Sequence, residues 1–169
     1  MPYIKKESRP PYDALINEIV GKIENATDEQ IGIWINTFKT HIIYRPLPAF
    51  CPRNEAIDGE FNYFITKLLI SLNWVGDALI YYPYFETYKQ TSNKIEKLIR
   101  ECLTIYSLPQ SYFNYNRAIG MLTCCKLEFK RRYGNKAILA TTFLQMMIKN
   151  LYEEIGIYEN TKIEINGDV

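Results

Sequence analysis

Histidine and recognisable enzyme motifs are what this 169-residue sequence has least of. His41 is the single histidine, and the four cysteines form no C-x-x-C pair, so a zinc site is not expected. The Walker loop, G-x-G-x-x-G, G-x-S-x-G and H-E-x-x-H are all missing. No E-x-x-E pair occurs either, which removes the arrangement by which helical nucleotide pyrophosphatases hold Mg²⁺. The sequence therefore predicts no metal, no cofactor and no enzyme activity.

Charge of one sign and long hydrophobic runs are also lacking. The formal net charge is +1, whereas a dedicated nucleic-acid binder needs a broad basic field that releases counterions. No segment reaches the roughly 18 uncharged apolar residues that cross a bilayer, and the first residues include no apolar run of signal-peptide length. We therefore expect a cytoplasmic protein with reduced cysteines, no membrane contact, and a partner other than nucleic acid.

Apolar residues recur with helical spacing through most of the chain. Thr27 and Gln30 form a capping box, and Gly134 ends a long amphipathic segment. Asp58 is expected to cap a helix that follows a proline-containing loop over 44–57. The predicted helices span 12–24, 27–42, 59–73, 92–106, 113–133 and 136–155.

The remaining segments are predicted to be irregular or extended. Residues 74–90 are expected to form a short helix followed by an aromatic loop, because Asp77 and Pro83 interrupt the apolar run. Residues 3–6, "YIKK", and the final "TKIEINGDV" alternate apolar and polar side chains, which indicates two strands that pair. The predicted fold is thus mainly α, a bundle of about six helices with a two-stranded antiparallel ribbon from the termini. We expect one domain over 1–169, with 136–155 as an added helix.

Each predicted helix has an apolar stripe that we assign to the core. For the last helix the stripe is Ile138, Phe143, Met146, Met147 and Leu151. The predicted stripes of the first five helices are Leu15, Ile16, Ile19 and Ile23; Ile31, Trp34, Ile35, Phe38 and Ile42; Phe61, Phe64, Ile65, Leu68 and Leu72; Ile95, Leu98, Ile99 and Cys102; and Tyr115, Ala118, Leu122, Cys125 and Phe129.

A basic cluster is the clearest local departure from neutral charge. Six basic residues between Arg117 and Lys136 stand against one acid, Glu128. Arginine forks suit phosphate oxygens, which favours an anion-binding role for Lys126, Arg131 and Arg132. A basic last turn also interacts favourably with the helix dipole, so the cluster can also be explained by stabilisation of the helix end without a ligand.

Aromatic and amide side chains lie at the other end of the same predicted helix. Tyr112, Phe113, Asn114 and Asn116 could stack on a nucleobase and hold its polar groups. Fifteen residues separate Asn116 from Arg131, or about 22 Å along a helix axis, so one small ligand cannot contact both in one chain. Two antiparallel copies of the helix would bring the two ends together, so a ligand role predicts a dimer or larger homo-oligomer.

Several blocks of the sequence resemble a family of small phage and bacterial proteins. These blocks are "MPYIKKESRP" at the start, "GEFNYFITKLL" at 59–69, "YNRAIGMLTCCKLEFKRRYGN" at 115–135, and "KIEINGDV" at the end. The family in turn is similar to phage Thoeris anti-defence proteins, which sequester cyclic ADP-ribose-type signals between subunits without cleaving them. That resemblance implies stacking by Phe113 or Tyr112, polar contacts from Asn114 and Asn116, and a pyrophosphate clamp from Arg131 or Arg132. It also implies that the protein is located in the cytoplasm of the host cell.

Three functions remain open at this point. The first is a non-catalytic phage-encoded sponge that binds a phosphate-bearing cyclic nucleotide-type molecule at subunit interfaces. The second is an inhibitor or adaptor that binds a host protein through the aromatic segment 81–88, "YYPYFETY", and the proline loop. The third is a small hydrolase or transferase acting on nucleotides, which the missing metal ligands and base disfavour.

Overall fold

The computed structural model describes residues 4–44, 53–76, 82–108 and 111–166. Its α-helices are α1 (Pro10–Lys22), α2 (Asp28–Tyr44), α3 (Arg53–Ser71), α4 (Tyr82–Cys102), α5 (Tyr112–Tyr133) and α6 (Ile138–Asn166). Short 3₁₀ helices cover Lys6–Ser8, Ile23–Asn25, Leu103–Tyr106 and Gly134–Ala137. The prediction of a mainly α protein is confirmed. Within the described ranges there is no β-strand, so the two-stranded ribbon is not seen.

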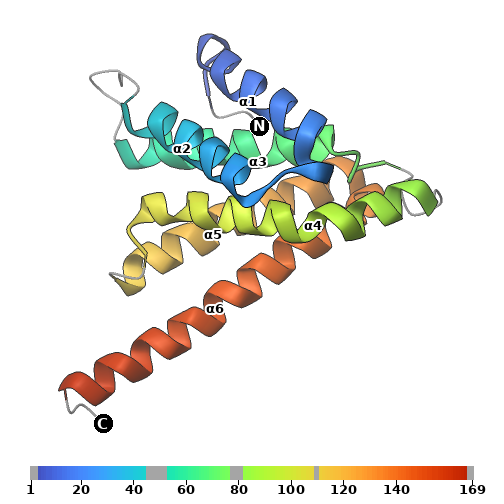
Figure 1. Ribbon diagram of the computed structural model, residues 1–169. Helices are drawn as coiled ribbons and strands as arrows, with labels where there is room; N and C mark the ends of the chain where they lie inside the picture. The colour runs from blue at the N-terminus through green and yellow to red at the C-terminus, as the bar shows by residue number, and fades with distance from the viewer. Residues whose placement is uncertain (1–3, 45–52, 77–81, 109–110, 167–169) are drawn as a thin grey trace.

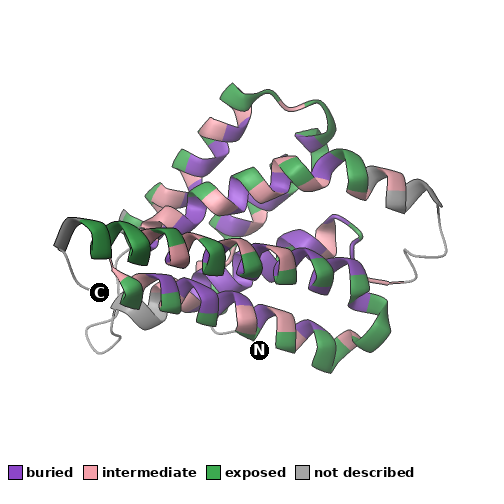
Figure 2. Cartoon of the chain, turned by 90° about the horizontal axis from the view of Figure 1, so that it is seen from below, coloured by how far each residue is buried: buried purple, intermediate pink, exposed green. Residues whose placement is uncertain are grey.

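Helix α3 is the centre of the bundle. From Gly59 to Leu69 every residue except Lys67 is buried, so this helix is covered on nearly all sides. It packs against α1 on one side and α5 on another, while α2 packs on α1 and α4. Figure 1 shows α1, α2 and α3 above α4 and α5, and Figure 2 shows the buried residues of these helices turned toward the interior.

The core consists of the apolar stripes of the helices. All the residues of the first five predicted stripes are buried. The ring centroid of Phe38 lies 4.9 Å from that of Phe61 and 4.5 Å from that of Phe64. In α6 the prediction was partly wrong, because Ile138 is 43% exposed and Met146 is only partly buried. Phe143, Met147 and Leu151 are buried as predicted.

Two of the predicted helix starts were wrong. Helix α3 begins at Arg53, inside the segment predicted as a loop, so Asp58 lies within the helix and is not its cap. Helix α4 begins at Tyr82, where an aromatic loop was predicted. Pro83 is then its second residue, in the first turn, where a missing backbone N–H breaks no helical hydrogen bond. Residues 45–52 and 77–81, the rest of the predicted loops, lie outside the described residues.

The segment predicted as the C-terminal strand is the last part of α6. The alternation of Ile163 and Ile165 suggested a strand, but the chain continues as one helix to Asn166. Helical contacts support this conformation: the Thr161 hydroxyl donates to the Ile157 carbonyl at 3.0 Å, and the Lys162 ammonium lies 5.9 Å from the centroid of the Tyr158 ring. Both pairs are four residues apart, a spacing at which groups become neighbours on a helix.

Helix α6 packs along α5 and reaches α4. Asn150 donates to Glu96 at 3.0 Å, and Arg100 pairs with Glu154. The segment 136–155, which we interpreted as an added helix, therefore lies against its own chain. The C-terminal part of α6 extends away from the other helices in Figure 1. Across the described residues, no helix combines the length and the hydrophobicity that crossing a membrane requires.

Two tyrosine–carboxylate hydrogen bonds join α1 to α3. The Tyr12 hydroxyl donates to Glu60 at 2.5 Å, and in the opposite direction the Tyr63 hydroxyl donates to Asp13 at 2.6 Å. Glu60 is buried, whereas Asp13 is half-buried. A buried carboxylate that loses a donor cannot replace it with water as readily as an accessible one can.

We therefore expect Tyr12→Phe to destabilise the fold more than the matched change Tyr63→Phe. The expected losses in the free energy of unfolding are about 2 to 3 kcal/mol for Tyr12→Phe and about 1 kcal/mol for Tyr63→Phe. Chemical denaturation followed by circular dichroism measures both. Equal losses would contradict the importance of Glu60 burial.

Candidate functional site

A pocket of about 520 Å³ lies between α3 and α5. Helix α3 contributes Asp58, Gly59 and Asn62, and helix α5 contributes the remaining wall. The residues from α5 are Arg117, Gly120, Met121, Cys124 and Glu128. Their spacing of three or four residues places them along one face of α5, so the regular helix by itself lines up the wall. Most of the lining is apolar, with polar groups at a few points, as is usual for ligand pockets.

An ion pair stands at one end of the pocket. Arg117 donates to Asp58 Oδ1 at 3.1 Å, and the Tyr106 hydroxyl donates to the same oxygen at 2.7 Å. The Arg117 guanidinium also lies over the Tyr106 ring, 5.1 Å from its centroid. Burial, followed by the charge of Asp58, raises the pKa of Tyr106, so this hydroxyl stays a donor. The bonds to Asp58 both go to Oδ1, which leaves Oδ2 able to accept from a ligand.

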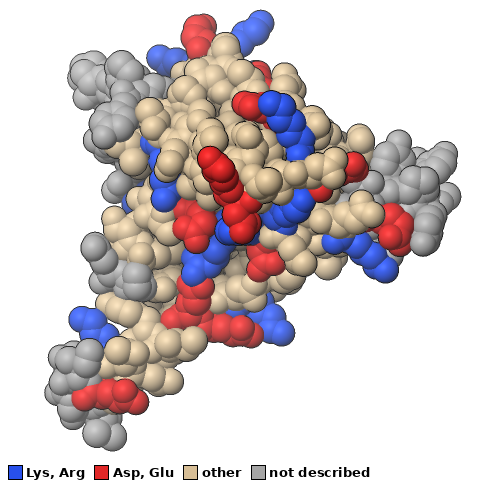
Figure 3. All heavy atoms as spheres, in the orientation of Figure 1, with Lys and Arg blue, Asp and Glu red and all other residues tan. Residues whose placement is uncertain are grey.

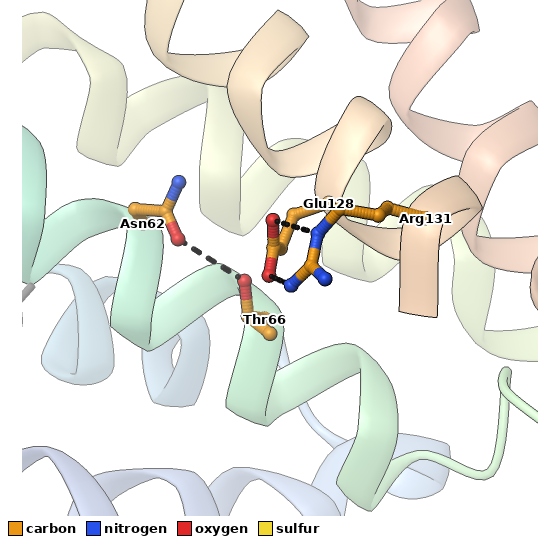
Figure 4. Close-up of polar contacts among 4 residues, drawn as sticks. All are labelled: Asn62, Thr66, Glu128 and Arg131. Carbon is orange, nitrogen blue, oxygen red and sulfur yellow. Dashed lines mark hydrogen bonds and ion pairs between the residues drawn. The ribbon is translucent and has the colours of Figure 1, made fainter. Parts of the chain in front are cut away.

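A second pair stands toward the other end. Arg131 contacts Glu128 through two nitrogens, with Nε 3.2 Å from Oε2 and Nη2 2.5 Å from Oε1. Figure 4 shows this fork beside α3, with Asn62 and Thr66 on the facing helix. The hydrogen bond from Arg131 lowers the pKa of Glu128 below its usual value. Glu128 is therefore a carboxylate at neutral pH and can act only as an acceptor.

Between the two ion pairs lies the side chain of Asn62. It is 6% exposed, and its Oδ1 accepts from the Thr66 hydroxyl at 3.4 Å, one turn further along α3. Asn62 lines the pocket, and among the described residues no acceptor bonds its Nδ2. Buried amide groups usually have hydrogen-bond partners. The amide of Asn62, as part of the pocket lining, could therefore donate to a ligand.

Gly120 borders open space in the pocket. A Cβ built at this position meets no heavy atom within 4 Å, so a longer side chain there would extend into that space. Gly120 is inside α5 and costs about 1 kcal/mol of helix stability compared with alanine.

The residues predicted for ligand binding do not come together in one chain. Tyr112 and Phe113, at the start of α5, are 51% and 66% exposed. Asn116 is exposed as well, and the Asn114 backbone N–H donates to the Ser111 hydroxyl at 3.1 Å, which caps the helix. These four residues are not among the described ones that line the pocket.

The predicted basic residues point in different directions. Arg131 adjoins the pocket through Glu128, whereas Arg132 lies over the Tyr133 ring at 5.3 Å from its centroid. Lys126 donates to Gln145 and lines a separate groove between α5 and α6. Figure 3 shows acidic and basic side chains interspersed over the visible face, without a continuous basic area. The basic cluster of the sequence is therefore divided between at least two surfaces.

Sequence reasoning missed Asp58, Asn62, Arg117 and Glu128 as site residues. The family resemblance could have indicated them. Two of the blocks that carry it, "GEFNYFITKLL" and "YNRAIGMLTCCKLEFKRRYGN", contain three of these four residues. Asn62 and Thr66 lie outside the apolar stripe assigned to this helix, and nothing in the sequence showed that they are buried. The pairing of α3 with α5 is a tertiary contact.

The family model of a domain of unknown function (DUF6899) matches residues 1–106, and the chain belongs to this family. The matched part contains α1 to α4, and with them Asp58 and Asn62, but it ends before α5. No curated protein and no solved structure matches the chain. Within the described residues, no group of three or more His, Cys, Asp and Glu side chains could hold a metal ion.

The Arg131–Glu128 pair leads to a prediction about titration. Arg131→Ala removes the hydrogen bond that holds the pKa of Glu128 down, so we expect this pKa to rise toward its usual value. The matched change Arg132→Ala removes a side chain that lies on Tyr133 and lowers this pKa only through its charge, so it should raise the pKa of Glu128 by less. NMR titration of the Glu128 side-chain carboxyl distinguishes the two. A similar rise in both variants would show that general charge, and not the specific bond, lowers the pKa.

Proposed function

We propose that this member of the DUF6899 family is a non-catalytic binding protein that sequesters a small nucleotide-derived molecule, with the base in the pocket between α3 and α5. One observation carries the proposal: a mostly apolar pocket of about 520 Å³ whose lining includes the amide residue Asn62, which is 6% exposed. Pockets of about 300 to 1,000 Å³ with a few convergent polar groups are typical of small-molecule sites.

The polar groups suit a heterocyclic base. Asn62 Nδ2 can donate to a ring nitrogen or carbonyl, and Asp58 Oδ2 can accept from an exocyclic amino group. Met121 and the carbon atoms of Gly120 provide an apolar surface for the ring faces. A base that met both polar groups would form hydrogen bonds in addition to burying its apolar area.

Phosphate groups would extend toward the basic last turn of α5. Arg131 already forms a fork with Glu128, and a guanidinium can share its five donors between a carboxylate and a phosphate. Arg132 is exposed in the same turn. Lys126 is directed to Gln145 and is the weakest of the predicted phosphate contacts.

The arrangement of the pocket favours binding over chemistry. Cys124 lines the pocket and could act as a nucleophile, but a cysteine nucleophile requires a neighbouring base. His41, the single histidine of the chain, lies on α2 with its ring 6.1 Å from that of Tyr12. It is not one of the described residues that line the pocket.

The biological role we propose is the one that the resemblance implies, sequestration of a cyclic ADP-ribose isomer or a related cyclic nucleotide by a phage-encoded protein. In this role the exposed rings of Tyr112 and Phe113, with Asn114 and Asn116, would complete the site from a second subunit. Two copies are required because the rings and the arginines occupy opposite ends of α5.

Filling the pocket tests its role directly. Gly120→Leu places a side chain in the open space, so we expect at least a tenfold loss of affinity with equal or greater stability of the fold. The matched control is Gly32→Leu on α2, where a Cβ also meets nothing and no pocket residue is touched. Calorimetry with cyclic ADP-ribose and a panel of cyclic nucleotides measures the affinities. Equal binding by both variants would place the ligand elsewhere.

The fate of the ligand separates the three functions. The protein is incubated with the ligand and then heated, so that the bound ligand is released for mass analysis. If the protein is a sponge, the ligand should be recovered intact. An altered ligand would show an enzyme, and no binding of any tested compound would favour the protein-interaction role.

The arginines form a second test. Replacement of both Arg131 and Arg132 by alanine should abolish binding of a phosphate-bearing ligand while the helical circular dichroism spectrum is retained, because each exposed side chain contributes little to the core. Unchanged affinity in the double variant would exclude a phosphate clamp in this turn.

A further inference from the structure

One side of α6 is exposed along its whole length. Ile138, Tyr152, Ile157 and Ile163 are large apolar residues that are 43%, 58%, 68% and 45% exposed. The exposed polar residues that accompany them are Thr142, Gln145, Lys149, Glu153, Asn160 and Glu164. At 100° per residue, these ten positions fall on one broad side of the helix, opposite the buried Phe143, Met147 and Leu151. We propose that this side of α6 pairs with α6 of a second copy of the chain, with the two helices antiparallel about a two-fold axis near position 151.

The pattern of the exposed residues is self-complementary. In an antiparallel pair about position 151, Ile138 meets the second copy's Ile163. Met146, which is partly buried on the same side of α6, meets the second copy's Ile157. Lys149 meets the second copy's Glu153. The midpoints of these three pairs all fall within about half a residue of position 151, so one register satisfies two apolar contacts and one charge pair. A two-fold axis then repeats each contact, as isologous interfaces require.

Charge is distributed to suit the same pairing. The first half of the exposed side borders a groove of about 500 Å³ between α5 and α6, whose described lining includes Lys126, Lys130 and Lys149 and no acidic residue. The second half carries Glu153 and Glu164 and, by the same 100° spacing, no basic residue, because Lys162 lies on the other side of the helix. An antiparallel arrangement lays the acidic half of each helix along the basic groove of the other. A parallel arrangement would put like charges together, which costs free energy.

The shape of the chain permits the contact. Twenty-five residues separate Ile138 from Ile163, or about 38 Å along the axis, and the pairing uses all of that length. The C-terminal part of α6 extends beyond the other helices, which leaves it accessible to a second copy (Figure 1). None of the residues involved is among those described as lining the pocket between α3 and α5, so the pairing is independent of the proposed ligand site.

Charge reversal tests both the interface and its symmetry. The wild-type chain should sediment as a dimer at micromolar concentration. Lys149→Glu and Glu153→Lys should each weaken self-association at least tenfold, because each substitution places like charges together twice in a symmetric pair. An equimolar mixture of the two variants should dimerise like the wild type, since one contact would join the introduced glutamate to the introduced lysine and the other would keep the original pair. Lys67→Glu, at an exposed lysine on α3, is the matched control and should leave the dimer intact.

The apolar contacts need their own variant. Ile157→Asp should give a monomer, whereas Leu127→Asp, which places the same charge at an exposed apolar residue of α5, should remain a dimer. Circular dichroism confirms that both variants fold. A monomeric wild type would overturn the proposal, as would a dimer that survives Ile157→Asp or a mixture of charge variants that stays monomeric.

Discussion

The burial of α3 on nearly all sides is the constraint on which the rest of the structure depends. A helix covered by α1, α5 and the aromatic side chains of α2 has little solvent-facing surface for its polar residues. Each buried polar group on it must find a partner inside the protein, because an unpaired buried group costs on the order of 1 to 3 kcal/mol. Apolar packing around Phe61, Phe64 and Leu68 supplies the stabilisation that offsets this requirement.

Three polar residues of α3 meet that constraint in different ways. Glu60 accepts from Tyr12 on α1 and becomes part of the helix contact. Thr66 donates to Asn62 within the same helix. The Asn62 amide, by contrast, opens onto a cavity whose far wall belongs to α5. A polar side chain in such a position lowers the stability that an apolar residue would provide, and functional sites are where local rules of this kind are broken.

The two ends of the pocket hold arginine–carboxylate pairs that differ in origin. Asp58 and Arg117 lie on different helices and are 59 residues apart in the sequence, and Tyr106 joins them from the end of the 3₁₀ segment. Glu128 and Arg131 lie on one helix, three residues apart. The first pair thus depends on the packing of α3 on α5, while the second forms wherever α5 forms. A ligand between them would contact both kinds of group.

The sequence by itself determined the helices whose apolar stripes repeat regularly, together with the bond from the Gln30 N–H to the Thr27 hydroxyl and the break at Gly134, since these follow from interactions within a few residues. The sequence led to a wrong prediction for the end of α6. The alternation of Ile163 and Ile165 is compatible with a strand, and only the structure shows that the preceding helix continues through these residues. The basic cluster was visible, yet its division between the pocket rim and the groove beside α6 depends on which face of α5 turns toward α3. Only the tertiary structure decided that division and brought Asn62 to the pocket, because contacts between residues far apart in the chain leave no local pattern.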